Sequence, residues 1–454
     1  MITSINPATE EEIKSWPEDG PEAIDDALNK ARWAYGQWRK TRLSERVNLV
    51  HKLADILHER MEDASALMSA EMGKTLAAGR AEITKCVQYC HYTADSARFF
   101  LEDEEADTEF KHTFTRPLPL GVILLVMPWN FPFWQVIRQA AATILAGNVC
   151  LLKHASSVPG CAVMLEELFE KAGFPEGVFQ TLLIRHGAVA AILEDARVQG
   201  ASLTGSERAG SSVAAICGKH IKPCVLELGG SDPFIVMPSA DLDEALKHAI
   251  IGRMRNTGQS CIAAKRLIVH RDIYDDFRHG FIERMNAMTI GDPLDADTDL
   301  GPLSSRRALD EVRAQIREAV KQGARLTEGT QALPKTGFYL RPGILEGVTP
   351  EMAVYEQEIF APVAQLYKVS SLDAAIELAN DIPLGLSSVL FSKDKEEQQQ
   401  AIMEIEAGST YINRYASSNI HLPFGGIKRS GFGREMAREG LRAFTNLKTI
   451  VIAN

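Results

Sequence analysis

Cysteine is sparse in this chain, and its distribution excludes two common uses of the residue. The seven cysteines among 454 residues are scattered, and no two of them form a C-x-x-C pair. The histidines do not stand at metal-site spacings either, so we expect neither a zinc site nor a disulfide framework. We predict that the protein binds no metal.

Long apolar runs and basic clusters are also missing. The longest apolar run, Val122 to Met127, is far too short to span a bilayer and is typical of a buried strand. The segment from Met1 to Pro7 has neither the basic region nor the apolar core of a signal peptide, which predicts a cytoplasmic protein with no membrane role. A net charge of -11 without a basic stripe disfavours nucleic acid as a partner.

The chain is long enough for more than one hydrophobic core. Single cores stop growing near about 250–300 residues, so a chain of 454 residues predicts two or three domains. A helical pattern runs from Pro21 to about Leu101, and from Val122 onward apolar strands alternate with helices. This alternation is typical of a doubly wound α/β fold, which binds ligands at the carboxyl ends of its strands.

The segment from Arg255 to Cys261 is the strongest candidate for a reactive centre. Polar residues that favour turns lead into Cys261, and the apolar run Ile262 to Ala264 follows. If a helix begins at this junction, its free N–H groups and positive dipole end favour the thiolate, which is the nucleophilic form. The alternative is a buried cysteine that serves only as a small hydrophobic residue.

Asn130 and Arg138 follow the apolar strand that ends at Met127. Asn130 lies among prolines and aromatic rings, where its amide either stabilises an oxyanion or closes a local Asx turn. A helix is expected next, and the four-residue spacing of Asn130, Trp134 and Arg138 places them on one face. An arginine there requires an anion, which is either a substrate or an internal Asp or Glu.

Polar residues also stand at the ends of two later strands. Lys153 and Ser156 follow the expected strand 149–152, with a solvated lysine as the alternative for Lys153. Gly205 and Ser206 begin a helix whose free N–H groups suit a pyrophosphate, although the full GxGxxG pattern is absent.

Two carboxylates stand in positions that suit chemistry or cofactor binding. Glu227 lies in an apolar strand, so it requires a partner or a raised pKa, and a raised pKa suits a general base. Glu358 beside Phe360 suits a ribose and a nicotinamide, but equally a solvent-facing turn. A glycine-rich basic segment, 423–435, by itself resembles a phosphate loop.

Taken together, these segments resemble the aldehyde dehydrogenase superfamily. Seven motifs occur in the order typical of that family, and they span nearly the whole chain. They are the Asn130 turn, Lys153, Gly205-Ser206, Glu227–Gly230, Gly258–Cys261, Glu358–Phe360 and Pro423–Gly426.

The resemblance implies an aldehyde dehydrogenase-like α/β fold, with two doubly wound parallel-sheet domains and a β arm for oligomerisation. Residues 1–100 and 120–229 would form the cofactor-binding domain, and residues 230–430 the catalytic domain. Residues 101–119 and 431–454 would form the arm, and a homodimer or homotetramer is expected.

The resemblance also implies a reaction. Cys261 would attack a small-molecule aldehyde, and the Asn130 amide with the Cys261 N–H would hold the resulting oxyanion. After hydride transfer to nicotinamide, Glu227 would activate the water that hydrolyses the thioester. Relatives that pass the acyl group to coenzyme A generally lack this base, so a free acid is the expected product.

The resemblance assigns a set of cofactor-binding residues and predicts NADP as the preferred cofactor. The set is Trp129, Lys153, Ser156, Gly205, Ser206, Leu228, Glu358 and Phe360. NAD-specific relatives often carry glutamate at the position of Ser156, where it repels a 2′-phosphate. Serine there, with Lys153 and His154 nearby, predicts that NADP is preferred and NAD accepted. Gln357 and Ala361 depart from the family's usual glutamate and glycine, which alters the shape of the pocket.

Within the superfamily the chain is most similar to the succinate-semialdehyde dehydrogenases. The resemblance places Arg138, Arg255 and Ser418 around the substrate carboxylate, with Trp134 also in the substrate site. Glutarate semialdehyde is the close alternative, because one methylene changes binding by only about 1–3 kcal/mol. A catalytically idle homologue is the distant alternative. Ala263 stands where some relatives carry a second, regulatory cysteine, so we expect no disulfide switch.

Overall fold

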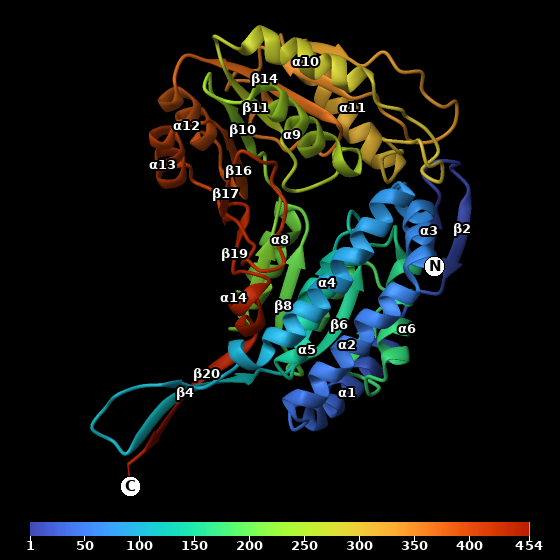
Figure 1. Ribbon diagram of the computed structural model, residues 1–454. Helices are drawn as coiled ribbons and strands as arrows, with labels where there is room; N and C mark the ends of the chain where they lie inside the picture. Colours follow the sequence, from blue (N-terminus) through green and yellow to red (C-terminus); the bar gives the residue numbers. More distant parts are fainter. Residues whose placement is uncertain (454) are drawn as a thin grey trace.

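Two parallel sheets, each covered by helices, form two α/β bodies from which a narrow arm projects (Figure 1). The computed structural model describes residues 1–453. In Figure 1 the body that contains the N-terminus lies below, the second body lies above, and the C-terminus is at the tip of the arm. The predicted doubly wound α/β fold is confirmed.

The first sheet has the strand order β19-β9-β8-β5-β6-β7, and only β19 pairs antiparallel to its neighbour. Its strands are β5 (Val122–Met127), β6 (Val149–His154), β7 (Phe179–Thr181), β8 (Val198–Thr204), β9 (Cys224–Glu227) and β19 (Gly431–Phe432). The apolar run predicted as a buried strand is β5 at the centre of this sheet, where both faces are covered.

Helices cover both faces of this first sheet. They are α1 (Pro21–Trp38), α2 (Leu43–Glu59), α3 (Met61–Met72), α4 (Leu76–Phe100), α5 (Trp134–Leu145), α6 (Pro159–Ala172), α7 (Val189–Glu194) and α8 (Glu207–Lys219), with the short 3-10 turn η1 (His186–Ala188). A two-stranded hairpin of β1 (Ile2–Ile5) and β2 (Glu12–Trp16) precedes them. Among residues 1–453, no helix combines the length and the apolar character that a membrane crossing requires.

The second sheet has the order β12-β13-β14-β11-β10-β16-β17, and it is parallel except for β12. Its strands are β10 (Pro233–Val236), β11 (Arg266–His270), β12 (Arg325–Glu328), β13 (Gly343–Glu346), β14 (Val363–Val369), β16 (Ser387–Phe391) and β17 (Ser409–Ile412). The helices are α9 (Leu242–Met254), α10 (Tyr274–Asn286), α11 (Arg306–Lys321), α12 (Leu372–Asn380) and α13 (Lys395–Glu404), with the 3-10 turns η2 (Arg255–Gly258) and η3 (Ala353–Tyr355). A small ribbon of β15 (Leu384–Gly385) and β18 (Ile427–Lys428) lies beside it.

The arm is shorter than the sequence suggested. Its sheet has the order β20-β4-β3, formed by β3 (Glu104–Glu105), β4 (His112–Pro119) and β20 (Thr445–Ile452). The expected boundary at residue 431 is wrong, because β19 joins the first sheet next to β9 and α14 (Ala437–Arg442) packs against α4 and α5. The last segment therefore returns to the first body before it enters the arm.

Candidate active site

The loop before Cys261 has an unusual backbone. Asn256 and Thr257 have φ values of 54° and 55°, and Gly258 follows with 73°, so three successive residues are left-handed. A Cβ at Gly258 would collide with the Ala361 carbonyl, which explains why only glycine fits there. The helix suggested at Cys261 is absent, because residues 261–263 form a turn that leads toward β11.

Side chains from both ends of the loop hold its carbonyl groups in place. The Arg253 guanidinium donates to the Gly258 carbonyl at 2.6 Å. Lys265 Nζ donates to the carbonyls of Ser260 at 2.9 Å and Cys261 at 2.5 Å. Neither residue was predicted from the sequence, because these contacts depend on the shape of the loop. The position of the Cys261 sulfur is therefore set by a buried arginine and a buried lysine.

The Cys261 thiol is partly withdrawn from solvent and lies among charged side chains. Burial raises its pKa to about 11, although nearby Lys265 and Arg138 act in the opposite direction. The thiol is therefore mainly protonated at neutral pH in the ligand-free protein. Because no helix begins at this position, the thiolate lacks the dipole stabilisation that the sequence suggested, and a proton acceptor is needed for attack.

Asn130 contacts the cysteine loop directly. Its Nδ2 donates to the Gln259 carbonyl at 3.2 Å, and the Asn256 side chain donates to the Asn130 carbonyl at 2.9 Å. The Asn130 amide therefore does not close a local Asx turn. The expected shared helical face is also corrected, because α5 begins at Trp134 and Asn130 precedes it in the turn.

Glu227 ends β9 and lines the same cavity as Cys261 and Asn130. Within the described chain, neither of its buried carboxylate oxygens has a hydrogen-bond partner. Burial, followed by the nearby Glu435 carboxylate, raises its pKa well above the ordinary range. The backbone of Gly425 covers it so closely that a Cβ there would lie 2.7 Å from Glu227 Oε1.

The cavity on this side of Cys261 has a volume of about 370 Å³ and collects most of the predicted cofactor residues. Those present are Trp129, Gly205, Ser206, Leu228, Glu358 and Phe360. Trp129 and Phe360 meet edge to face with ring centroids 5.8 Å apart. The Glu358 carboxylate pairs with Lys265 Nζ at 2.9 Å, and its side chain is only 23% exposed, so the alternative of a solvent-facing turn does not apply.

Lys153 and Ser156 lie at the end of β6, outside the lining of this cavity. Lys153 is buried, which lowers its pKa and contradicts the alternative of a solvated lysine. The neighbouring His154 cannot supply positive charge near neutral pH, because burial lowers its pKa to about 4 and its ring bonds to the Pro132 carbonyl at 2.9 Å. Of these two residues, Lys153 is therefore the one that can offer positive charge to a phosphate.

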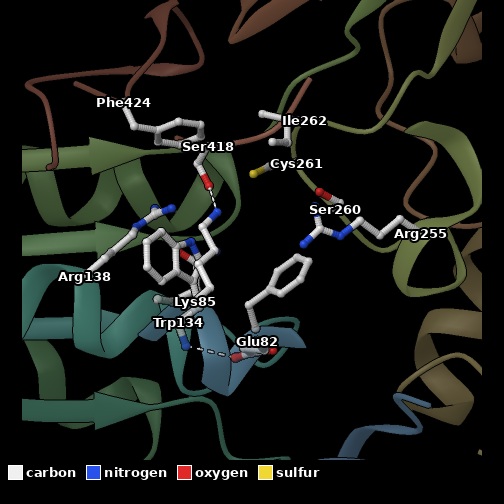
Figure 2. A pocket seen from close by; sticks show the side chains of 12 residues that line it. Glu82, Lys85, Trp134, Arg138, Arg255, Ser260, Cys261, Ile262, Ser418 and Phe424 are labelled. Atoms are coloured by element: carbon white, nitrogen blue, oxygen red, sulfur yellow. Dashed lines mark hydrogen bonds between the residues drawn. The ribbon is translucent and has the colours of Figure 1, made fainter. Parts of the chain in front are cut away.

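A second pocket lies on the other side of Cys261 (Figure 2). It brings together the four residues that the resemblance assigned to the substrate, which are Trp134, Arg138, Arg255 and Ser418. It also contains Glu82 and Lys85 from α4. These two residues could not be identified from the sequence, because the apolar spacing of that segment indicates only a helix that packs against the core. Cys261 thus faces one cavity with predicted cofactor residues and another with three cations.

The Arg138 guanidinium forms an ion pair with Glu435, and both side chains are buried. This is the internal acidic partner that the sequence left as the alternative to a substrate anion. The guanidinium also lies 4.9 Å from the centre of the Phe424 ring, and its Nη2 has no hydrogen-bond partner among the described residues. One edge of the Arg138 guanidinium is therefore paired with Glu435, and another edge can still donate a hydrogen bond to a ligand.

Comparisons with known proteins agree with this geometry. The model of the aldehyde dehydrogenase family matches residues 1–450. Succinate-semialdehyde dehydrogenase [NADP(+)] 1 of Mycobacterium tuberculosis strain H37Rv is 48% identical over 455 residues, with 100% of both chains covered. A crystal structure of succinic semialdehyde dehydrogenase from Streptococcus pyogenes in complex with NADP+ has a TM-score of 0.97 at 38% identity and also covers 100% of both chains. The chain belongs to the aldehyde dehydrogenase family.

Proposed function

We propose that this protein oxidises succinate semialdehyde to succinate with NADP. The observation that carries this proposal is a cysteine placed between two cavities, of which one is lined by cations suited to a carboxylate. Full-length relatives at 48% identity bear the name of this activity and this cofactor, which supports the same conclusion.

In the proposed mechanism, the Cys261 sulfur attacks the aldehyde carbon and forms a thiohemiacetal, whose oxygen takes up the proton that the thiol loses. The second N–H of the Asn130 amide and the Cys261 backbone N–H are the donors suited to the oxyanion. A nicotinamide held in the cavity lined by Trp129, Glu358 and Phe360 would supply the hydride acceptor, and the acyl group would then remain on Cys261 as a thioester. Glu227, buried and without a hydrogen-bond partner among the described residues, then takes a proton from the water that attacks the thioester. Succinate leaves, and the Cys261 sulfur regains a proton.

The residues present fit a dinucleotide. Ser206 caps the N-terminus of α8 by accepting from the Ala209 N–H at 3.4 Å, and Gly205 and Ser206 line the cavity, so the start of this helix is placed to suit a pyrophosphate. Thr204 Oγ1 lines the same cavity and is buried without a partner in the described chain, so it can bond to a ligand. Lys153 and Ser156, at the end of β6, would hold the ribose and its 2′-phosphate.

The substrate carboxylate gives the most direct test of the proposed function. Butanal has the same carbon count as succinate semialdehyde but lacks the carboxylate, so it offers no anion to the pocket cations. We expect kcat/KM with NADP to be roughly 100- to 1000-fold higher for succinate semialdehyde. Initial rates of NADPH formation measure this ratio, and equal rates would remove the substrate assignment while leaving an aldehyde dehydrogenase. Glutarate semialdehyde, tested in parallel, decides between the two chain lengths.

Ser156 tests the preference for NADP. A Ser156→Glu substitution places a carboxylate where the 2′-phosphate is expected, and juxtaposed like charges cost several kcal/mol. We expect kcat/KM for NADP to fall by roughly 100-fold, while the value for NAD changes only a few-fold. Ser156→Ala is the control that removes the hydroxyl without adding charge. If the ratio of kcat/KM for NADP to kcat/KM for NAD is unchanged in Ser156→Glu, the 2′-phosphate does not bind next to residue 156.

We also assign roles to the larger parts of the molecule. The first body would bind the cofactor, the second would supply the cysteine loop, and the arm would join copies of the chain into a homodimer or homotetramer. In support of the last role, β20 is an edge strand, and Leu447, Val451 and Ile452 on it are exposed.

A further inference from the structure

We propose that Lys85, on α4, binds the substrate carboxylate and is a main determinant of specificity for aldehydes that carry a distal acid. This inference rests on the proposed function and adds a residue to it. Neither the sequence motifs nor the predicted substrate residues include this lysine, which lies well before the first of them in the chain.

The Lys85 ammonium lies inside the substrate pocket. Figure 2 shows its side chain running past the Trp134 ring toward Ser418, on the side of the pocket that faces Cys261. Its Nζ donates to Ser418 Oγ at 2.5 Å and lies 4.2 Å from the centre of the Trp134 ring. The charged end of Lys85 is thereby held over the Trp134 ring and against Ser418, within the pocket.

No carboxylate neutralises this charge within the described chain. Arg138 pairs with Glu435, and the neighbouring Glu82 pairs with Lys74 and also accepts the N–H groups of Phe133 and Trp134. Burial, and after it the positive charge of Arg255, lowers the pKa of Lys85 to about 7. A partly buried cation without an anion is unfavourable, and a ligand carboxylate would correct the imbalance.

Lys85 also lies between the pocket and an adjoining cavity. Lys85, Arg255 and Ser418 line both the pocket that contains Cys261 and an adjoining cavity formed by α4 and the loop 417–421. These three residues therefore stand at the neck between the two spaces. A four-carbon aldehyde acid bound with its carboxylate at the neck would direct its aldehyde carbon toward the sulfur of Cys261.

Two substitutions of Lys85 test the proposal. Lys85→Met keeps the apolar stem and removes the charge, and we expect kcat/KM for succinate semialdehyde to fall by roughly 100-fold while the value for butanal stays within about three-fold. Lys85→Arg keeps the charge and should retain most of the preference for the acid. Arg98→Met, which removes one exposed charge from the same helix, is the matched control and should change neither substrate.

The pH profile gives a readout that a purely structural lysine would not change. The charged or titratable groups facing Lys85 are Arg255, Arg138, Glu82 and Cys86. Lys85 is cationic below its pKa of about 7, so the ratio of kcat/KM for the acid to that for butanal should fall as pH rises through this region. Titration of Cys261 changes both kcat/KM values by the same factor, so its effect cancels in their ratio. In Lys85→Met and in Lys85→Arg the ratio should not change with pH.

The outcomes separate the inference from the proposed function. If the wild type does not prefer the acid to butanal, both are overturned. If the wild type prefers the acid and Lys85→Met keeps the same ratio, only the role of Lys85 is overturned, and Arg138 and Arg255 hold the carboxylate. If Lys85→Met lowers kcat/KM for both substrates by the same factor, the lysine positions the loop 417–421 through Ser418. That result also overturns carboxylate binding by Lys85.

Discussion

Replacing Cys261 by alanine should reduce kcat by roughly 10⁴- to 10⁶-fold, because loss of a catalytic nucleophile removes the covalent route altogether. The loop is held by Arg253 and Lys265 through backbone carbonyls, so removal of the sulfur should leave the fold intact. NADPH formation at saturating succinate semialdehyde measures the loss, and circular dichroism during thermal unfolding measures the fold.

The matched control is Cys224→Ala, because this cysteine is half-buried at the start of β9 and does not line either cavity. Its kcat should equal that of the wild type within about two-fold, as for ordinary substitutions away from a site. Substantial activity in Cys261→Ala, with purified protein and no contaminating wild type, would exclude a thioester mechanism at this position.

Glu227→Gln should divide the reaction into a fast and a slow half. Glutamine has the same shape but cannot take a proton from water, so steady-state turnover should fall by roughly 10²- to 10⁴-fold. The first turnover does not require this water, so a burst of about one NADPH per active site should remain. Stopped-flow absorbance would measure the burst, and intact-protein mass spectrometry would show the succinyl group on the chain.

Hydroxylamine provides the control for this second prediction. It cleaves thioesters without needing a general base, so it should restore turnover in Glu227→Gln and have little effect on the wild type. A burst lost to the same extent as the steady state would assign Glu227 to an earlier step, in which it takes the proton of the Cys261 thiol. The raised pKa of that thiol makes such a role chemically reasonable.

The reactive groups could be recognised in the sequence because each belongs to a short local pattern. Cys261 follows its turn-forming residues directly, and Glu227 lies in an apolar strand where an unpaired carboxylate is conspicuous. Their supporting residues could not be found in this way. Lys85 and Ser418, which form a hydrogen bond, are 333 positions apart in the sequence. Arg138 and Glu435, which form an ion pair, are separated in the sequence by the whole second body.

Two sequence expectations failed for physical reasons that no local pattern reveals. No helix begins at Cys261, because residues 261–263 form a turn that leads toward β11. The left-handed Asn256 and Thr257 before it could not be expected from the sequence either, because residues other than glycine rarely adopt that conformation. The expected arm is too long because β19 has only two residues, Gly431 and Phe432, and gives little strand signal in the sequence. In the structure it pairs with β9, more than two hundred positions earlier in the chain. Long-range strand pairing is decided by the assembled sheet.

The left-handed pair Asn256 and Thr257 has a consequence for engineering this protein. Each such residue costs about 1–2 kcal/mol relative to a relaxed backbone, and the β-branched Thr257 is the more costly. Screens for thermal resistance would therefore select glycine at Thr257 rather than at Asn256, whose side chain donates to the Asn130 and Gln259 carbonyls. The same relaxation would let the Cys261 side chain move more, so a gain in thermal stability at this position would lower the catalytic rate. Stabilising substitutions are better sought in the helices farthest from the thiol.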